Sequence, residues 1–271
     1  MTTSMITKAT EMDYNKFKLS NTVKVNKYQG KSVYASYNNS IMRIQLPKMG
    51  LPFGISKFIN PDTGDIKYSL DMSMKDIDEK VFKNFEEIEN VVLEYAEKNS
   101  KELFKKQRSK EILKEFYKPF IKYNINEEGE RSDKYPPTFK TKLWTSGNDF
   151  SPDVFDAQKV DGKYPKIKMT LDNSDEVITA GSHCESIIQC SGLWVVGDSF
   201  GISWSVSQIK IYKNDNAIVG YAFQDEDVEM DDEEQETEEL EFNEEELEEH
   251  EIKIEEPVVV QKKRRRPKED L

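Results

Sequence analysis

Apolar and polar residues alternate along much of the chain, as expected for β-strands that bury one face. The longest strict alternation covers residues 202–212, where Ile202, Trp204 and Val206 share one face. A change of phase later in this segment predicts a β-bulge before Ile209. We predict strands over residues 22–25, 32–35, 41–46, 55–59, 67–72, 138–144, 164–169, 185–190, 193–196, 202–212 and 217–223.

Residues 78–118 follow a different pattern, in which apolar side chains recur every three or four positions. No Gly or Pro interrupts the segment before Pro119, so it predicts an amphipathic helical insertion. Asn99-Ser100 marks a break between two helices, because serine is a good N-cap residue. Nine Lys or Arg against three Asp or Glu lie between Lys98 and Lys122, and a solvated helix face is the ordinary explanation for this excess.

Short strands combined with one helical insertion predict a mainly β fold. An OB-fold-like barrel fits this pattern, since closure of the sheet removes exposed edges. We expect residues 1–20 to form an N-terminal arm, either mobile or a peripheral strand, and residues 21–224 to form the folded body. An acidic tail over residues 225–256 and a basic C-terminal segment over residues 257–271 complete the organisation.

Charge is distributed unevenly over the 271 residues, whose formal net charge is -13. Residues 225–271 hold 22 Asp or Glu and 7 Lys or Arg, whereas the preceding residues carry a net charge of +2. The acidic run repels itself and has little apolar surface, so we expect it to be disordered. The basic cluster Lys262–Lys268 resembles a nuclear-import signal or a nucleic-acid-binding tail, and it could equally fold back onto the acidic run.

The sequence argues against membrane insertion and export. No run approaches the roughly 18 apolar residues of a membrane-spanning helix, and the N-terminus lacks an apolar signal core. Cysteine is rare, with only Cys184 and Cys190, whereas secreted proteins with weak cores use many more. We therefore expect an intracellular protein in which these thiols are buried in strands.

Sequence signatures of catalysis are absent. The chain contains neither a phosphate-binding nor a dinucleotide-binding glycine motif, and no nucleophile elbow. His183, Cys184 and Cys190 offer metal-ligand atoms, but adjacent residues on a strand point to opposite faces, which makes joint ligation awkward. We expect no enzymatic activity, no cofactor and no metal.

The positive signal is a set of aromatic residues interleaved with basic residues on the predicted strands. Single-stranded nucleic acid is held this way, because rings stack on bases and cations attract phosphates. The candidate phosphate contacts are Arg43, Lys57, Lys67, Lys140, Lys142, Lys166 and Lys168. The candidate stacking residues are Tyr34, Tyr68, Tyr135 and Tyr164. The ordinary alternative is that rings fill a β core, which we favour for Phe58, Phe139, Trp194 and Trp204, and that lysines line a solvated face.

Three groups of segments together resemble a known family. These segments are residues 51–58 with 67–71, residues 135–143, and residues 189–194 followed by 200–204. They resemble a single-stranded DNA-binding family encoded by large nucleocytoplasmic DNA viruses, itself similar to the single-stranded DNA-binding proteins of short-tailed bacteriophages. The resemblance covers roughly residues 41–224.

This resemblance implies an OB-fold barrel with a helix between strands, a cationic binding face and an acidic tail. In the phage proteins the tail competes with DNA, contacts replication enzymes and ends in an aromatic residue. The present chain ends instead in Glu269-Asp270-Leu271, which weakens any transfer of those tail contacts.

We therefore expect sequence-independent binding of single-stranded DNA in viral replication, recombination or repair, with an acidic tail that competes for the binding face. The expected partners are single-stranded DNA and, through the tail, viral replication proteins, in the host nucleus or a cytoplasmic viral factory; a homodimer stays open. One alternative is a β-rich structural or interaction protein of a virion or viral factory, whose tail binds basic partners and whose lysines would be scattered. Another is an acidic protein resembling a histone chaperone.

Overall fold

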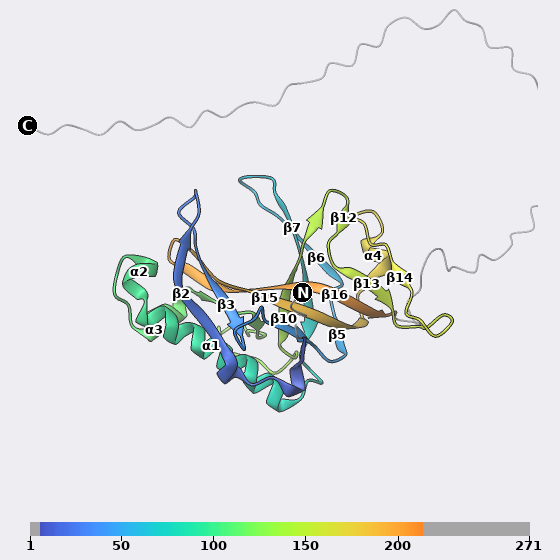
Figure 1. Cartoon of the computed structure of the whole chain (residues 1–271), viewed down its shortest axis with the longest axis horizontal. Helices are drawn as coiled ribbons and strands as arrows, with labels where there is room; N and C mark the ends of the chain where they lie inside the picture. The colour runs from blue at the N-terminus through green and yellow to red at the C-terminus, as the bar shows by residue number, and fades with distance from the viewer. Residues whose placement is uncertain (1–5, 214–271) are drawn as a thin grey trace, which may run out of the picture. The chain divides into compact units, whose positions relative to one another are not determined.

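The computed structural model describes residues 6–213, which form a sheet with the helices of residues 79–116 on one side (Figure 1). The strands are β1 (Thr7–Lys8), β2 (Phe17–Val25), β3 (Lys31–Tyr37), β4 (Arg43–Gln45), β5 (Met49–Leu51), β6 (Ile55–Ile59), β7 (Ile66–Ser73), β8 (Tyr117–Lys118), β9 (Ile121–Lys122), β10 (Thr138–Leu143), β11 (Thr145–Ser146), β12 (Asp149–Phe150), β13 (Asp153–Asp156), β14 (Lys166–Ile167), β15 (Ser182–Val196) and β16 (Ser199–Tyr212). The α-helices are α1 (Glu79–Lys98), α2 (Ser100–Phe104), α3 (Lys110–Phe116) and α4 (Ser174–Val177).

The main sheet is organised around the long antiparallel pair β15 and β16. Its strand order is β1-β4-β15-β16-β10-β7-β6, so that β1 and β6 stand at the two ends of this order. The mainly β class with a helical insertion is confirmed, but the described strands do not close into the expected barrel. Closure would require a second partner for β6, which among the described strands pairs only with β7, whereas β15 pairs with β5, β4 and β3 one after another along its length.

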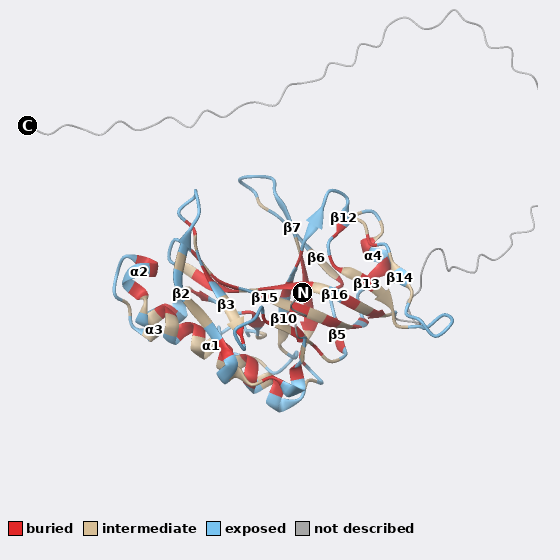
Figure 2. Cartoon of the chain, in the orientation of Figure 1, coloured by how far each residue is buried: buried red, intermediate tan, exposed pale blue. Residues whose placement is uncertain are grey.

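Helix α1 covers one face of this sheet (Figure 2). Its apolar side chains recur on one stripe, and Phe85 packs edge-on against Phe139 of β10 and Trp204 of β16, at ring-centroid distances of 4.9 and 5.9 Å. The Asp78 side chain caps the helix by accepting a hydrogen bond from the Lys80 backbone N–H. Burial of this stripe provides the main core beneath the sheet.

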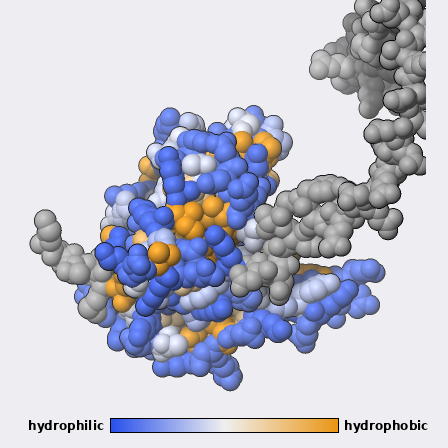
Figure 3. Space-filling view, turned by 90° about the vertical axis from the view of Figure 1, so that its right-hand side faces the viewer, coloured by the Kyte–Doolittle hydropathy of each residue, from blue (hydrophilic) through white to orange (hydrophobic). Residues whose placement is uncertain are grey.

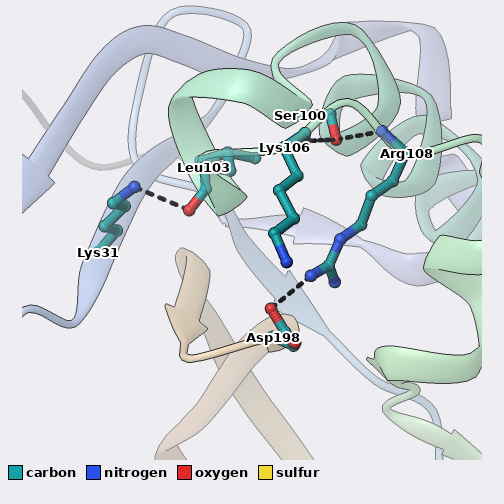
Figure 4. Close-up of polar contacts among 6 residues, drawn as sticks. All are labelled: Lys31, Ser100, Leu103, Lys106, Arg108 and Asp198. Carbon is teal, nitrogen blue, oxygen red and sulfur yellow. Dashed lines mark hydrogen bonds and ion pairs between the residues drawn. The ribbon is translucent and has the colours of Figure 1, made fainter.

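The predicted break in the helical insertion is confirmed, because α1 ends at Lys98 and α2 begins at Ser100. A loop separates α2 from α3, and the hydroxyl of buried Ser100 helps to order this loop (Figure 4). This hydroxyl donates to the Lys106 carbonyl at 2.9 Å and accepts from the Arg108 backbone N–H at 3.0 Å.

A hydrogen bond and an ion pair tie α2 and its following loop to the sheet (Figure 4). Lys31 of β3 donates to the Leu103 carbonyl at 2.8 Å, where the carbonyl ends of a helix attract a cation. Arg108 contacts Asp198, in the β15–β16 turn, at 2.5 Å. At least one cation of the basic helical segment therefore has a structural role.

The N-terminal segment, expected as a mobile arm or a peripheral strand, joins the sheet from Thr7 onward. Strand β1 pairs in parallel with β4, and Ala9 and Met12 are buried. The Asn84 side chain of α1 donates to the Met12 carbonyl at 2.9 Å.

Most predicted strands are present, and the predicted bulge lies in β16. Val206 pairs with Ile188, whereas Gln208 pairs with the preceding residue, Ile187, so that Ser207 is the additional residue. The strand predicted over residues 217–223, the acidic tail and the basic C-terminal segment lie outside the described residues.

Both cysteines are buried free thiols, as predicted, and desolvation raises the pKa of each to about 12. Within residues 6–213, no helix has the length and apolar character needed to cross a membrane.

Candidate nucleic-acid interface

A row of register partners crosses six neighbouring strands of the main sheet. Its members are Arg43 of β4, Gln189 of β15, Ser205 of β16, Lys142 of β10, Ser69 of β7 and Ser56 of β6. Register partners on adjacent strands project from the same face of a sheet. Phe139 and Trp204, which alternate with members of the row, point toward α1. The row therefore lies on the face opposite α1, which we call the polar face.

The β2–β3 and β6–β7 hairpins extend from the side of the sheet that faces away from α1 (Figure 1). The charged members of the row are held by polar neighbours on the same face. Arg43 Nε donates to Gln189 Oε1 at 2.9 Å, and Lys142 Nζ donates to Ser203 Oγ at 2.8 Å. Two cations that are 99 positions apart in the chain thus belong to one ordered surface.

Lysines gather around the β7–β10 part of the row. Desolvation lowers the pKa of Lys142, and the positive charge of Lys67 lowers it further. Desolvation likewise lowers the pKa of Lys140, with Lys122 adding to the decrease and Asp71 opposing it. The buried Asp71 carboxylate lies 3.4 Å from Lys122 Nζ. Four lysines against one carboxylate in this part of the face leave a positive surface that would attract a polyanion.

Exposed aromatic rings lie beside these cations. Trp144 is 55% exposed, and its ring centroid lies 5.8 Å from Lys142 Nζ. Phe58 of β6 pairs with Lys67 and is 58% exposed. The expectation that Phe58 fills the core is therefore wrong, because it lies in the projecting β6–β7 hairpin. Phe139 and Trp204, by contrast, are confirmed as core residues.

A second aromatic and cationic pair lies on the β2–β3 hairpin. Lys24 Nζ donates to the Tyr34 hydroxyl at 3.2 Å and lies 4.5 Å from the centre of its ring. The Tyr34 ring is 57% exposed and available for stacking. Between this hairpin and the row, the ring of half-buried Trp194 lies across Gly201, so Trp194 covers the polar face and not the core.

A pocket of about 450 Å³ opens on the polar face at the other end of the β15–β16 pair. Tyr164 lines it, and its ring lies between Lys159 and Lys210, whose Nζ atoms are 5.0 and 5.2 Å from the ring centroid. The structure therefore brings together four predicted cations, Arg43, Lys67, Lys140 and Lys142, with Tyr34 and Tyr164 at two ends of the same face.

Three predicted residues, Lys57, Tyr68 and Tyr135, do not join this surface, whereas Lys166 shares a face with its register partner Phe155, which lines the pocket. Lys57 pairs with Tyr68 on the alternate face of the β6–β7 hairpin, where the Tyr68 ring packs edge-on against Phe150 at 5.2 Å. Tyr135 lies before β10 and lines a different pocket that includes Phe82 of α1.

Two further predicted cations form ion pairs near β14. Lys166 Nζ lies 2.6 Å from Asp153 and Lys168 Nζ lies 3.5 Å from Asp149. These carboxylates offset the positive charge that was expected to attract phosphate.

Several residues of the polar face were not among the predicted contacts, among them Lys24, Gln189, Ser203 and Trp144, although Trp144 belongs to the aromatic and basic pattern of the predicted strands. The alternation over residues 202–212 contained part of the signal, since serines occupy the positions between the apolar residues. Only the register of pairing shows which side chains on β4 and β10 lie beside those serines.

The described region is thus a mainly β protein with one cationic, aromatic face. Residues 64–226 match a family of unknown function, DUF5871, and the chain belongs to this family. No curated protein matches the chain. Within residues 6–213, no group of three or more His, Cys, Asp or Glu side chains is arranged to hold a metal ion.

Solved structures with a partial likeness include single-stranded DNA-binding proteins of a bacteriophage. The single-stranded DNA-binding protein from bacteriophage Enc34 in complex with ssDNA is 14% identical, with a TM-score of 0.38 over 72% of this chain and 98% of that chain. The same phage protein in a second structure is 15% identical, with a TM-score of 0.36 over 76% of this chain and 96% of that chain. Its C-terminal truncation is 13% identical, with a TM-score of 0.33 over 74% of this chain and 98% of that chain.

Proposed function

We propose that the polar face binds single-stranded DNA without sequence preference, in the replication, recombination or repair of viral DNA. The observation that carries this proposal is the row of register partners, which places Arg43 and Lys142 on one face with Lys67 and Lys140. A scattered distribution of these lysines would instead have favoured a structural protein of a virion. Replication proteins as partners of the acidic tail, and the host nucleus or a viral factory as the location, belong to the same proposal.

The binding mode follows from the chemistry of the face. Lysine ammonium groups attract backbone phosphates, and the exposed rings of Trp144, Phe58 and Tyr34 offer stacking surfaces to bases. Neither interaction depends strongly on base identity, because every nucleotide has a phosphate and every base has a π-face. We expect affinity to fall with salt, by about 0.7 log units per log unit of salt for each phosphate neutralised.

Lys142 provides the sharpest test of the proposed face. Lys142→Ala should weaken binding of labelled oligo-dT by about tenfold, because a charged hydrogen bond to phosphate is lost. The salt dependence should also become shallower, by about 0.7 in slope. Fluorescence anisotropy of the full chain, titrated at several salt concentrations, measures both quantities.

Lys83→Ala is the matched control, since Lys83 is an exposed lysine of α1 that pairs with Glu79 at 2.7 Å. This variant should bind oligo-dT as tightly as the unmodified protein. Equal losses from the two substitutions would place the binding surface elsewhere, and failure of the full chain and of residues 1–224 to bind oligo-dT at low salt would reject the proposed function.

The C-terminal region adds a competitor to this proposal. Residues 225–271 carry a net charge of -15 and follow β16, one of the strands that forms the polar face. A tethered polyanion has a high effective concentration near its own chain, so it competes with DNA for the cations.

Removal of residues 225–271 should therefore raise the affinity for oligo-dT, most strongly at low salt. A variant of the same length with the acidic residues of 225–256 changed to Asn and Gln separates charge from length. Both variants should bind more tightly than the full chain in the same anisotropy titration; unchanged affinity in both would contradict competition by the tail.

A further inference from the structure

The pocket beside the row differs in chemistry from the lysine cluster. Gln45 lies two positions after Arg43 on β4, and its register partner Ile187 pairs in turn with Gln208 of β16. All three line the pocket, so its floor is the next row of the polar face. A strand of DNA that follows the cations across the sheet passes directly beside this pocket.

Two of the three charged side chains that line the pocket, Glu185 and Lys210, compensate each other, and Lys163 is the third. Lys210 Nζ lies 2.8 Å from Glu185 Oε2, and the Tyr212 hydroxyl donates to Glu185 Oε1. These contacts lower the pKa of Glu185 and raise that of Lys210, in each case against the opposing effect of desolvation. A compensated ion pair offers little net attraction to phosphate, so the part of the pocket lined by Glu185 and Lys210 favours a neutral group, while Lys163 can attract a phosphate.

The walls match a flat ligand with polar edges. The rings of Phe155 and Tyr164 line the pocket together with the carboxamides of Gln45 and Gln208. Each carboxamide has both donors and an acceptor, as the edge of a nucleobase requires. The volume of about 450 Å³ falls within the range of roughly 300–1,000 Å³ that small-molecule sites occupy. From the side on which β13 and β14 lie, the surface is mostly hydrophilic with separate apolar patches (Figure 3).

We propose that this pocket takes one unstacked nucleobase of the bound single strand, with Tyr164 as the stacking surface and Gln45 and Gln208 as hydrogen-bonding partners of the base edge. This inference rests on the proposed function, since the DNA must first lie on the polar face. Phosphates on either side of the inserted base would then meet Lys163, which precedes Tyr164 in the chain, and Lys159, whose Nζ lies 5.0 Å from the Tyr164 ring centroid.

The test compares two oligomers of equal length, one with intact thymine bases and one with abasic positions, bound by the full chain and by its variants. The unmodified protein should prefer the intact oligomer. Tyr164→Ala should weaken binding of the intact oligomer by about tenfold and barely change binding of the abasic oligomer, because stacking on one base is worth about 1–3 kcal/mol. The Tyr164→Ala variant should therefore prefer the intact oligomer over the abasic oligomer less strongly than the unmodified protein does.

Tyr135→Ala is the matched control, because Tyr135 is an exposed tyrosine with Lys134 over its ring that lies away from the polar face, in the pocket that includes Phe82 of α1. It should leave the preference unchanged. Gln208→Leu provides a second variant, in which the new side chain has a size similar to that of glutamine. It should weaken binding of the intact oligomer and not of the abasic oligomer, because the carboxamide is lost. Circular dichroism of each variant checks that the fold is kept.

The outcomes separate this inference from the proposed function. If the unmodified protein binds neither oligomer at low salt, the proposed function fails. If it binds both oligomers, but Tyr164→Ala and Gln208→Leu weaken intact and abasic DNA equally or not at all, only the base pocket is rejected.

Discussion

Replacing Gly192 with alanine should lower the free energy of unfolding by about 4 kcal/mol, the largest effect of a single methyl group that we expect in this protein. Gly192 has a φ of +109°, which side chains disfavour, and a Cβ atom there would lie 2.2 Å from the Val33 carbonyl oxygen. Strand β3 cannot simply recede, because Val33 pairs with Leu193, the next residue of β15. Backbone strain at residue 192 and steric overlap with β3 therefore both destabilise the alanine variant.

Gly197→Ala is the matched control for this prediction. Gly197, in the β15–β16 turn, also has a positive φ of +59°, but an added Cβ would meet no atom within 4 Å. It should cost about 1–2 kcal/mol from backbone conformation alone. Urea denaturation of both variants measures the difference, and equal losses of stability would show that close packing of β3 on Gly192 is unimportant. If the prediction holds, oligo-dT binding should weaken as well, because this contact positions Tyr34.

The second large effect is a dependence of stability on pH that comes from Glu89 of α1. Its Oε1 accepts hydrogen bonds from the Phe120 and Ile121 backbone N–H groups at 3.0 and 3.4 Å. Desolvation dominates over these bonds and raises the pKa of Glu89 to about 7, with the nearby charge of Glu86 adding to the increase. The folded protein therefore keeps this proton at pH values where the unfolded chain has released it.

Because the folded state binds the extra proton, the contribution of Glu89 to stability is complete at low pH and is lost as the pH rises from the ordinary carboxyl value of 4.5 through about 7. The loss amounts to about 3 kcal/mol by pH 8. Glu89→Gln keeps an oxygen acceptor for the Phe120 N–H but cannot ionise. This variant should therefore be more stable than the unmodified protein at about pH 8, with its advantage disappearing at about pH 5.

Urea denaturation at several pH values tests this expectation. Glu79→Gln, at the exposed start of the same helix, should retain the pH dependence of the unmodified protein. If Glu89→Gln showed the same slope of stability against pH as Glu79→Gln, the burial of Glu89 would not be the cause.

Local pattern was sufficient to predict most elements of secondary structure. The strand over residues 202–212 and its bulge follow from a side-chain period of two residues, and the helical insertion follows from a period of about 3.6. The helix break at Asn99-Ser100 follows from the N-cap preference of serine. Burial was harder to predict. Phe139 and Phe58 both lie in strands, yet only Phe139 faces α1, whereas Phe58 lies in a hairpin that projects from the sheet.

The candidate site shows the same division more sharply. The sequence by itself determined that cations and rings alternate on strands, and that a net charge of -15 follows the folded body. Only the tertiary structure decided that Arg43 and Lys142 share a row, that Lys57 belongs to the other face and that Tyr164 borders a pocket. The physical reason is that strand pairing joins residues far apart in the chain, and a shift of one residue in register moves every side chain to the opposite face.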